Sequence, residues 1–247
     1  MASLPQVEDI GVLEALAPSD QVEVARQVLA DVYRSSLYHL CRDGLGYQDL
    51  TWHTHGKIVL ALQAQTRRKL IVVPRGSFKS SITVVGFSIF LLLRDPNVRI
   101  LIDSELYSNS ATFLREIKAH LQSPHFVALF GSFEGPIWNE GEITIRQRTV
   151  PRKEASITCG GVETTKVGQH YDVIIGDDFN SPKNTATAEG RRKVIDHIRY
   201  NVSILEPGGT LAFTATRYHE EDATGFILRD LVGISVEEAF AATAQAA

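Results

Sequence analysis

Short apolar runs alternate with longer segments of helical periodicity along most of this chain. The runs that predict β-strands cover residues 70–74, 98–103, 143–147, 155–161, 171–178 and 210–216. The segments that predict helices cover residues up to about 45, then 53–65, 80–93, 104–121 and 187–205. Such alternation is typical of an α/β fold, and we expect a mainly parallel sheet sandwiched by helices.

The same pattern divides the chain into three parts. We expect a helical N-terminal segment over 1–45, an α/β domain over 46–235, and an Ala-rich tail or truncated linker over 236–247. The longest apolar run, ITVVGFSIFLLL at 82–93, is shorter than the roughly 20 residues that cross a bilayer. It therefore predicts a buried helix, and we expect no membrane partner.

Composition and charge narrow the class of protein further. The chain has 247 residues, of which 44% are hydrophobic and 22% charged, as in ordinary globular proteins. A net charge of −4 argues against nucleic acid binding over the whole surface, but allows a local basic patch. Cys41 and Cys159 are too few for a disulfide framework, and the acidic N-terminus lacks the apolar run of a signal peptide. We therefore expect an intracellular protein.

The stretch VVPRGSFKSSI (72–82) joins a predicted strand to a predicted helix. In α/β sheets ligands bind at the carboxyl ends of strands, where free N–H groups of a following helix favour anions. Lys79 fits the lysine that contacts nucleotide phosphates, and Ser80 fits the hydroxyl that holds Mg²⁺. The predicted nucleotide-binding residues of this loop are Arg75, Gly76, Ser77, Phe78, Lys79, Ser80 and Ser81.

Two positions of this loop depart from the usual pattern G-x-x-x-x-G-K-[ST]. Val73 and Phe78 stand where the pattern has glycine, so Gly76 is the one glycine inside the loop. We expect Phe78 to keep an ordinary L-residue backbone, with its ring against the sheet or the following helix and away from the phosphates. The alternative is a tight turn with a solvated lysine.

The strand at 171–178 ends in two acidic residues. In phosphoryl-transfer sites one carboxylate holds the metal shell, which we assign to Asp177. A second group orients the attacking water, which we assign to Asp178. The alternative is that both residues cap the next element, with 180–182 as a turn. The order of the two motifs suits a P-loop ATPase with an additional strand between them.

A third segment, TLAFTATRYHEEDATGF (210–226), ends another apolar strand at the same sheet edge. A hydroxyl of Thr214 or Thr216 there is placed to sense the γ-phosphate and couple its loss to a neighbouring segment. The alternative is that Thr216 or Asp222 caps a helix. Residues 219–222 lack the spacing of metal ligands, so we do not expect a metal cluster there.

Together VPRGSFKSS, VIIGDDFNSPKN and TATRYHEED resemble the ATPase domain of the large terminase subunit of tailed bacteriophages, over residues 50–230. The resemblance implies a P-loop NTPase of the additional-strand type that binds ATP and Mg²⁺. It implies a motor that drives double-stranded DNA through the portal into the procapsid, with portal protein and small terminase subunit as partners. The expected assembly is a homo-oligomeric ring during packaging and a monomer in isolation, in the host cytoplasm and transiently at the portal vertex.

The resemblance also implies roles for single residues. Arg75 would lie near the γ-phosphate and join Lys79 and Asp178 in catalysis, and Thr214 to Thr216 would couple hydrolysis to movement. The adenine would bind upstream of the loop, where the candidates are Gln48, Trp52 and His53. The alternative for Trp52 is helix packing. Terminases normally carry a C-terminal nuclease domain as well, and we expect no nuclease activity from this chain.

Ring-shaped ATPases often receive an arginine from a neighbouring subunit. Arg146, Arg148 and Arg152 are the candidates for this finger, and the first two have the spacing of residues on one face of a strand. The alternative is that these arginines only meet solvent. Residues 191–193 and Arg199 form the densest basic helix, which predicts either contacts to DNA phosphates or a solvated helix face.

Two other functions remain open from the sequence. A helicase or another DNA translocase would use the same ATPase core, although the motifs of a second helicase core are not visible. A nucleotide-binding scaffold without hydrolysis is suggested by Phe78 and by an aspartate at 178, where many such motors have glutamate.

Overall fold

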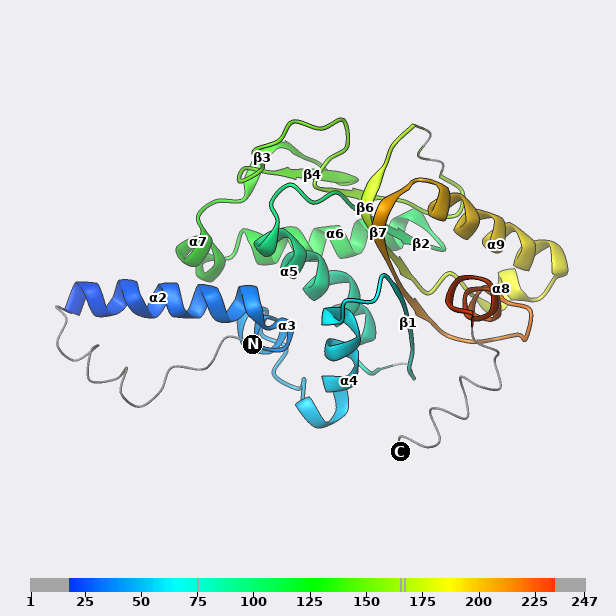
Figure 1. Cartoon of the computed structure of the whole chain (residues 1–247), viewed down its shortest axis with the longest axis horizontal. Helices are drawn as coiled ribbons and strands as arrows, with labels where there is room; N and C mark the ends of the chain where they lie inside the picture. The colour runs from blue at the N-terminus through cyan, green and yellow to red at the C-terminus, as the bar shows by residue number, and fades with distance from the viewer. Residues whose placement is uncertain (1–17, 75, 165, 167, 234–247) are drawn as a thin grey trace.

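A computed structural model describes residues 18–74, 76–164, 166 and 168–233, and in this part of the chain helices flank one seven-stranded sheet (Figure 1). The strand order is β1-β7-β6-β2-β5-β4-β3. The strands are β1 (Arg68–Val72), β2 (Ile100–Ser104), β3 (Glu134–Trp138), β4 (Glu142–Ile145), β5 (Ile157–Cys159), β6 (Tyr171–Asp177) and β7 (Leu205–Ala215). The pairs β1–β7, β7–β6, β6–β2 and β2–β5 are parallel, and the pairs β5–β4 and β4–β3 are antiparallel. The predicted α/β class with a mainly parallel sheet is therefore confirmed.

The helices begin and end close to the predicted boundaries. They are α2 (Pro18–Ser35), α3 (Leu37–His39), α4 (Trp52–Gln63), α5 (Phe87–Arg94), α6 (Tyr107–Leu121), α7 (Pro124–Phe130), α8 (Pro182–Thr185), α9 (Ala188–Ser203) and α10 (Ala223–Phe226), with π-helical turns η1 (Leu40–Gly44), η2 (Ser81–Gly86) and η3 (Ile227–Val232). The sequence pattern missed β3, α7 and α8, which are short and carry little periodicity. No helix of the described residues is long and apolar enough to cross a membrane.

Alternating residues of the central strands feed two separate hydrophobic cores, one on each face of the sheet. In β2, Ile100 and Ile102 join the larger core, which contains buried residues of α4, α5 and α6. Leu101 between them joins the smaller core, together with residues of α9 and α10. Since successive side chains of a strand point to opposite faces, helices cover both faces of the sheet, as predicted.

Strand β7 separates β1 from β6 and brings their carboxyl ends to one edge of the sheet. Thr214 in β7 lies opposite Ile71 of β1 on one side and Asp177 of β6 on the other. Ser104 at the end of β2 lies opposite Asp177 as well. All four strands are parallel, so the loops that follow them emerge next to one another. The motif residues therefore gather at this edge.

The segment between β4 and β5 differs from the prediction. Strand β4 ends at Ile145, so Arg146 lies in a turn and Arg148 in the loop after it. The prediction that Arg146 and Arg148 lie on one face of a strand is therefore wrong. Because β4 is antiparallel to β5, this turn lies at the edge of the sheet opposite to the carboxyl ends of β1, β6 and β7.

The N-terminal helices share the larger core with the helix that follows β1. Leu37, Leu40 and Cys41 are fully buried in that core, and α2 extends beyond the sheet (Figure 1). A Cβ atom on Gly86 would come within 2.3 Å of Cys41 Sγ. Gly86 therefore lets η1 approach η2 closely.

The close approach of η1 and η2 generates a double-mutant prediction. We expect Gly86→Ala to reduce the free energy of unfolding by about 1–3 kcal/mol, because the added methyl group overpacks against Cys41. In a Cys41→Ala background the same change should cost at least about 1 kcal/mol less, since the sulfur atom is gone and alanine favours a helix. Urea denaturation of the four proteins measures this coupling, and strictly additive costs would contradict it.

Candidate functional site

Lys79 lies at the centre of a polar cluster at the carboxyl edge of the sheet. Its side chain is only 7% exposed, and its ammonium donates hydrogen bonds of 2.8 Å to Asp178 Oδ1 and to Thr216 Oγ1. Lys79 lies at the start of the helix after β1, Asp178 follows β6 and Thr216 follows β7, so three different segments supply the three side chains. Thr216 also donates to Asp178 at 3.0 Å, which closes a ring of three contacts. The solvated lysine of the alternative reading is therefore wrong.

A second set of contacts lies beside Lys79 and includes the other acidic residue. Ser80 Oγ donates a hydrogen bond of 2.8 Å to Asp177 Oδ1, and Thr214 Oγ1 donates to the same oxygen. Burial raises the pKa of Asp177 above its ordinary value, although the two hydroxyl donors oppose the shift. The site therefore holds a carboxylate whose negative charge is not fully compensated.

Three residues around these side chains have backbone φ angles in the left-handed region. Gly76 has φ 79°, which glycine adopts without strain. Phe78 has φ 53° and Asp178 has φ 41°, where a residue with a Cβ atom pays roughly 1–2 kcal/mol. Ser77 Oγ donates 2.6 Å to the carbonyl of Pro74 and helps to close the loop. Backbone strain is thus concentrated on both sides of Lys79.

The ordinary backbone predicted for Phe78 is wrong, while packing of its ring against the sheet or the following helix stays a prediction. Without glycine at this position, the left-handed turn falls on Phe78 itself. Its ring packs against the larger core, where it lies edge-on to His55 of α4, with ring centroids 5.6 Å apart, and near Tyr47 at 6.3 Å. Tyr47 is held in turn by a 2.7 Å hydrogen bond to Glu116. These upstream aromatic contacts hold the ring in the larger core.

The segment after β7 is fixed by Asp222, which caps α10. Its carboxylate accepts hydrogen bonds from the backbone of Gly225, Tyr218 and His219. The capping alternative is therefore confirmed for Asp222. Among the described residues, no group of three or more His, Cys, Asp and Glu side chains is arranged to hold a metal ion.

The adenine candidates Trp52 and Gln48 have local contacts. Trp52 is half exposed and packs edge-on against Tyr38, with ring centroids 5.3 Å apart, and over Gly56. His53 is exposed, and Gln48 donates to the carbonyl of Arg42 at 3.0 Å. Trp52 therefore has the packing role of the alternative interpretation, and its adenine role stays a prediction.

The three arginine-finger candidates, Arg146, Arg148 and Arg152, lie outside the cluster. Arg75 falls outside the described residues. Arg146 donates to the carbonyl of Glu134 at 3.1 Å and Arg148 to that of Glu154 at 2.6 Å, while Arg152 is exposed. Burial lowers the pKa of Arg148. All three lie at the opposite edge, so any role as a finger would act on a neighbouring subunit.

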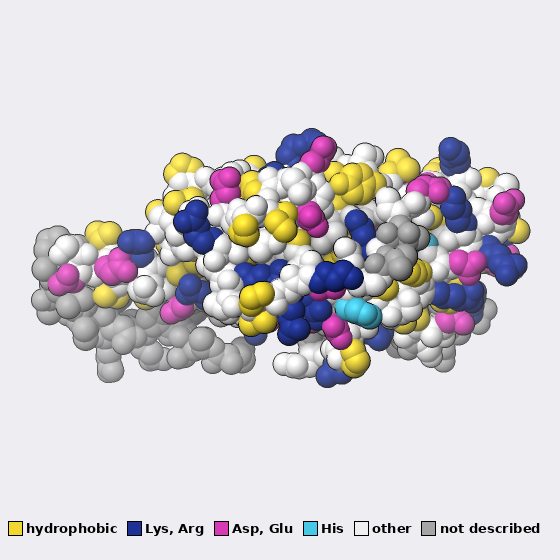
Figure 2. Space-filling model, turned by 90° about the horizontal axis from the view of Figure 1, so that it is seen from above, with side chains coloured by type: hydrophobic (Ala, Val, Ile, Leu, Met, Phe, Trp, Pro, Cys, Tyr) yellow, Lys and Arg dark blue, Asp and Glu magenta, His cyan; other side chains and the backbone are white. Residues whose placement is uncertain are grey.

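The basic residues of α9 are matched by acidic neighbours. Arg191 pairs with Glu221 at 3.2 Å and Arg199 with Asp196 at 2.9 Å. The further pairs are Lys193 with Glu163 and Arg192 with Asp196. On the face seen in Figure 2, Lys and Arg side chains likewise lie among Asp and Glu rather than in one continuous stripe. This helix surface therefore carries little net positive charge.

Two buried polar groups beside the cluster gave no signal in the sequence. Asp103 at the end of β2 accepts hydrogen bonds of 2.6 Å from His197 and Asn201 of α9. Asn180, two residues after Asp178, contacts the ends of both β7 and α10. Both depend on residues far apart in the chain, so periodicity could not predict them.

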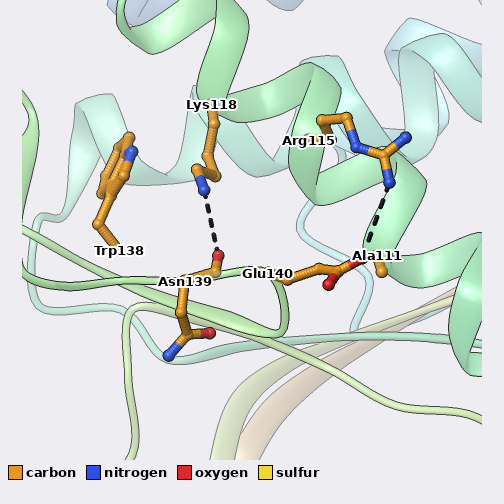
Figure 3. Close-up of a pocket in the computed structure, with 6 residues that line it drawn as sticks. All are labelled: Ala111, Arg115, Lys118, Trp138, Asn139 and Glu140. Carbon is orange, nitrogen blue, oxygen red and sulfur yellow. Dashed lines mark hydrogen bonds and ion pairs between the residues drawn. The ribbon is translucent and has the colours of Figure 1, made fainter.

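A surface hollow of about 360 Å³ lies at the far end of the sheet, between α6 and the β3–β4 turn (Figure 3). Lys118 points from α6 toward the turn, where it donates to the carbonyl of Asn139 at 3.2 Å and lies over the ring of Trp138. Arg115 and Glu140 pair at 3.8 Å across the same hollow. Strands β2 and β5 separate β4 from β6, so the hollow is distinct from the Lys79 cluster.

Neither the family models nor the curated proteins that were compared with this chain gave a match.

Alanine variants are usually more stable than glycine variants, and the left-handed backbone of Phe78 should reverse this order. We expect Phe78→Gly to be about 1 kcal/mol more stable than Phe78→Ala, because both lose the ring contacts but only glycine relieves the backbone strain. Thermal unfolding of the two variants measures the difference. As a control at the helical residue Ser88, Ser88→Ala should be more stable than Ser88→Gly. Alanine more stable at position 78 would rule out the left-handed turn.

Proposed function

We propose that this chain is an Mg²⁺-dependent ATPase domain of the P-loop, additional-strand type. One observation carries the proposal. At one sheet edge a buried lysine at the start of a helix contacts Asp178 and Thr216. Asp177, the preceding carboxylate, accepts hydrogen bonds from Ser80 and Thr214. A lysine, a serine hydroxyl and a pair of acidic residues in this arrangement are the groups that phosphoryl transfer requires. The position of β7 between β1 and β6 supports the additional-strand type.

Lys79 would contact the β- and γ-phosphates and balance the charge that develops during transfer. In the structure its ammonium contacts Asp178 and Thr216. In this proposal, phosphate replaces Asp178 as the anionic partner of the Lys79 ammonium. Once released, the carboxylate of Asp178 can accept a hydrogen bond from the attacking water and orient it.

The residues beside Lys79 fit a magnesium ion. Mg²⁺ prefers hard oxygen ligands and is held in nucleotide sites by few protein groups together with phosphates and water. Ser80 Oγ and the carboxylate of Asp177 lie 2.8 Å apart and would hold it. A bound cation would compensate the buried charge of Asp177, the carboxylate that burial now disfavours. When bound, Mg²⁺ would neutralise charge on the transferred phosphoryl group.

The more specific proposal is the motor domain of a phage large terminase. It rests on the resemblance of VPRGSFKSS, VIIGDDFNSPKN and TATRYHEED, which supply the clustered side chains. The expected partners are double-stranded DNA, the portal protein and the small terminase subunit, in a homo-oligomeric ring in the host cytoplasm. The paired charges of α9 suit a surface that slides along DNA more than one that grips it tightly.

The proposal predicts that hydrolysis depends on Lys79. Lys79→Ala should lower Mg²⁺-dependent phosphate release at least about 100-fold, since one preorganised charge at the transferred group is worth that much. The rate is measured at high protein concentration, so that neighbouring subunits can contribute residues. The far-UV circular dichroism should stay that of the parent chain.

An exposed lysine next to the site provides the matched control. Lys183→Ala in α8 makes the same chemical change without touching the cluster, and its rate should stay within about twofold. Unchanged turnover in Lys79→Ala would refute the site. Nucleotide binding by a parent chain that releases no phosphate would instead favour the scaffold function.

A further inference from the structure

Asn180 links three segments of the candidate site from a buried position. It is 6% exposed and lies in the loop after β6. Its Nδ2 donates to the carbonyl of Thr216 at 3.1 Å and to Thr224 Oγ1 at 2.9 Å. Its Oδ1 accepts from the backbone N–H of Ala223 at 3.2 Å. One side chain thus joins the loop after β6, the end of β7 and the start of α10.

Thr216 needs such a support because it lies just beyond the sheet. Strand β7 ends at Ala215, whose partner in β1 is Val72, and the pairing of β7 with β6 ends at Asp177 and Thr214. The carbonyl of Thr216 is therefore held by a side chain and not by a strand neighbour. A residue with only side-chain support moves easily when that support is removed.

The hydroxyl of Thr216 lies where its position matters for the proposed chemistry. It accepts from Lys79 at 2.8 Å and donates to Asp178 at 3.0 Å. Displacing Thr216 by about 1 Å would break both contacts and change the direction of the Asp178 carboxylate. Displacements of this size can reduce a rate about 100-fold.

We propose that Asn180 is a positioning residue, which holds the carbonyl of Thr216 and thereby sets the Thr216 hydroxyl against Lys79 and Asp178. This role rests on the proposed ATPase function and adds to it a residue that touches neither phosphate nor metal. It acts through Thr216 and not through α10. Asn180 Nδ2 makes one hydrogen bond to Thr216 and one to Thr224 of α10, so variants can separate the effect of one from that of the other.

The test compares Asn180→Asp with Thr224→Val in steady-state ATP hydrolysis. Asn180→Asp keeps the shape and the acceptor for Ala223, but sets an oxygen against the Thr216 carbonyl. We expect kcat to fall about 10- to 100-fold, with the KM for ATP within about threefold, because Lys79 and Ser80 remain. Thr224→Val removes only the α10 bond, and its kcat should stay within about threefold of the parent. Asn180→Ala removes the same donor and replaces Asn180→Asp if that variant does not fold.

A double variant decides whether the effect passes through Thr216. Thr216→Val removes the hydroxyl, so adding Asn180→Asp to it should cause no further loss of kcat. A parent-like kcat in Asn180→Asp, an equal loss in Thr224→Val, or losses that multiply in the double variant would each overturn the role of Asn180 alone. A parent chain without hydrolysis would overturn the ATPase function and this role with it.

Discussion

The hydrogen-bonded ion pair between Lys79 and Asp178 is the contact on which the rest of the site depends. A buried ammonium is costly unless it is paired, and Lys79 opens an otherwise apolar helix. The pair forms because β7 lies between β1 and β6 and adds the Thr216 hydroxyl to it. The strand order at this sheet edge therefore also provides the partners that balance the buried charge of Lys79.

The backbone is strained at the residue before Lys79 and at its ion-pair partner, Asp178. Phe78 and Asp178 each occupy the left-handed region, at a cost that other contacts must offset. The ring of Phe78 is supported by His55 and Tyr47, and the N–H of Asp178 donates to the carbonyl of Thr214. These supports come from elements on both sides of the loop in sequence. The loop thus keeps its curvature with one glycine, Gly76, because Phe78 adopts the left-handed conformation of the missing second glycine and core contacts hold its ring.

The sequence predicted the parts of the site that follow from strand order. The residues that follow β1, β6 and β7 include Lys79-Ser80, Asp178 and Thr216, and parallel neighbouring strands must deliver them to one edge, as they do. It could not predict the partners of Phe78, because Tyr47 and His55 reach it through tertiary packing. Asn180 looked like part of a turn, since its partners Thr216 and Thr224 lie far along the chain. The end of β4 before Arg146 was missed because the run ITIRQ alternates as a strand would.

The most direct test of the account is the affinity for Mg²⁺ and a non-hydrolysable ATP analogue, measured by calorimetry in the parent chain and in Asp178→Asn. If phosphate replaces Asp178 at Lys79, removing that charge should tighten binding by about fivefold, roughly 1 kcal/mol for a partly exposed ion pair. Binding that weakens in Asp178→Asn would contradict the exchange at Lys79. Absence of binding in both proteins would contradict the nucleotide site itself.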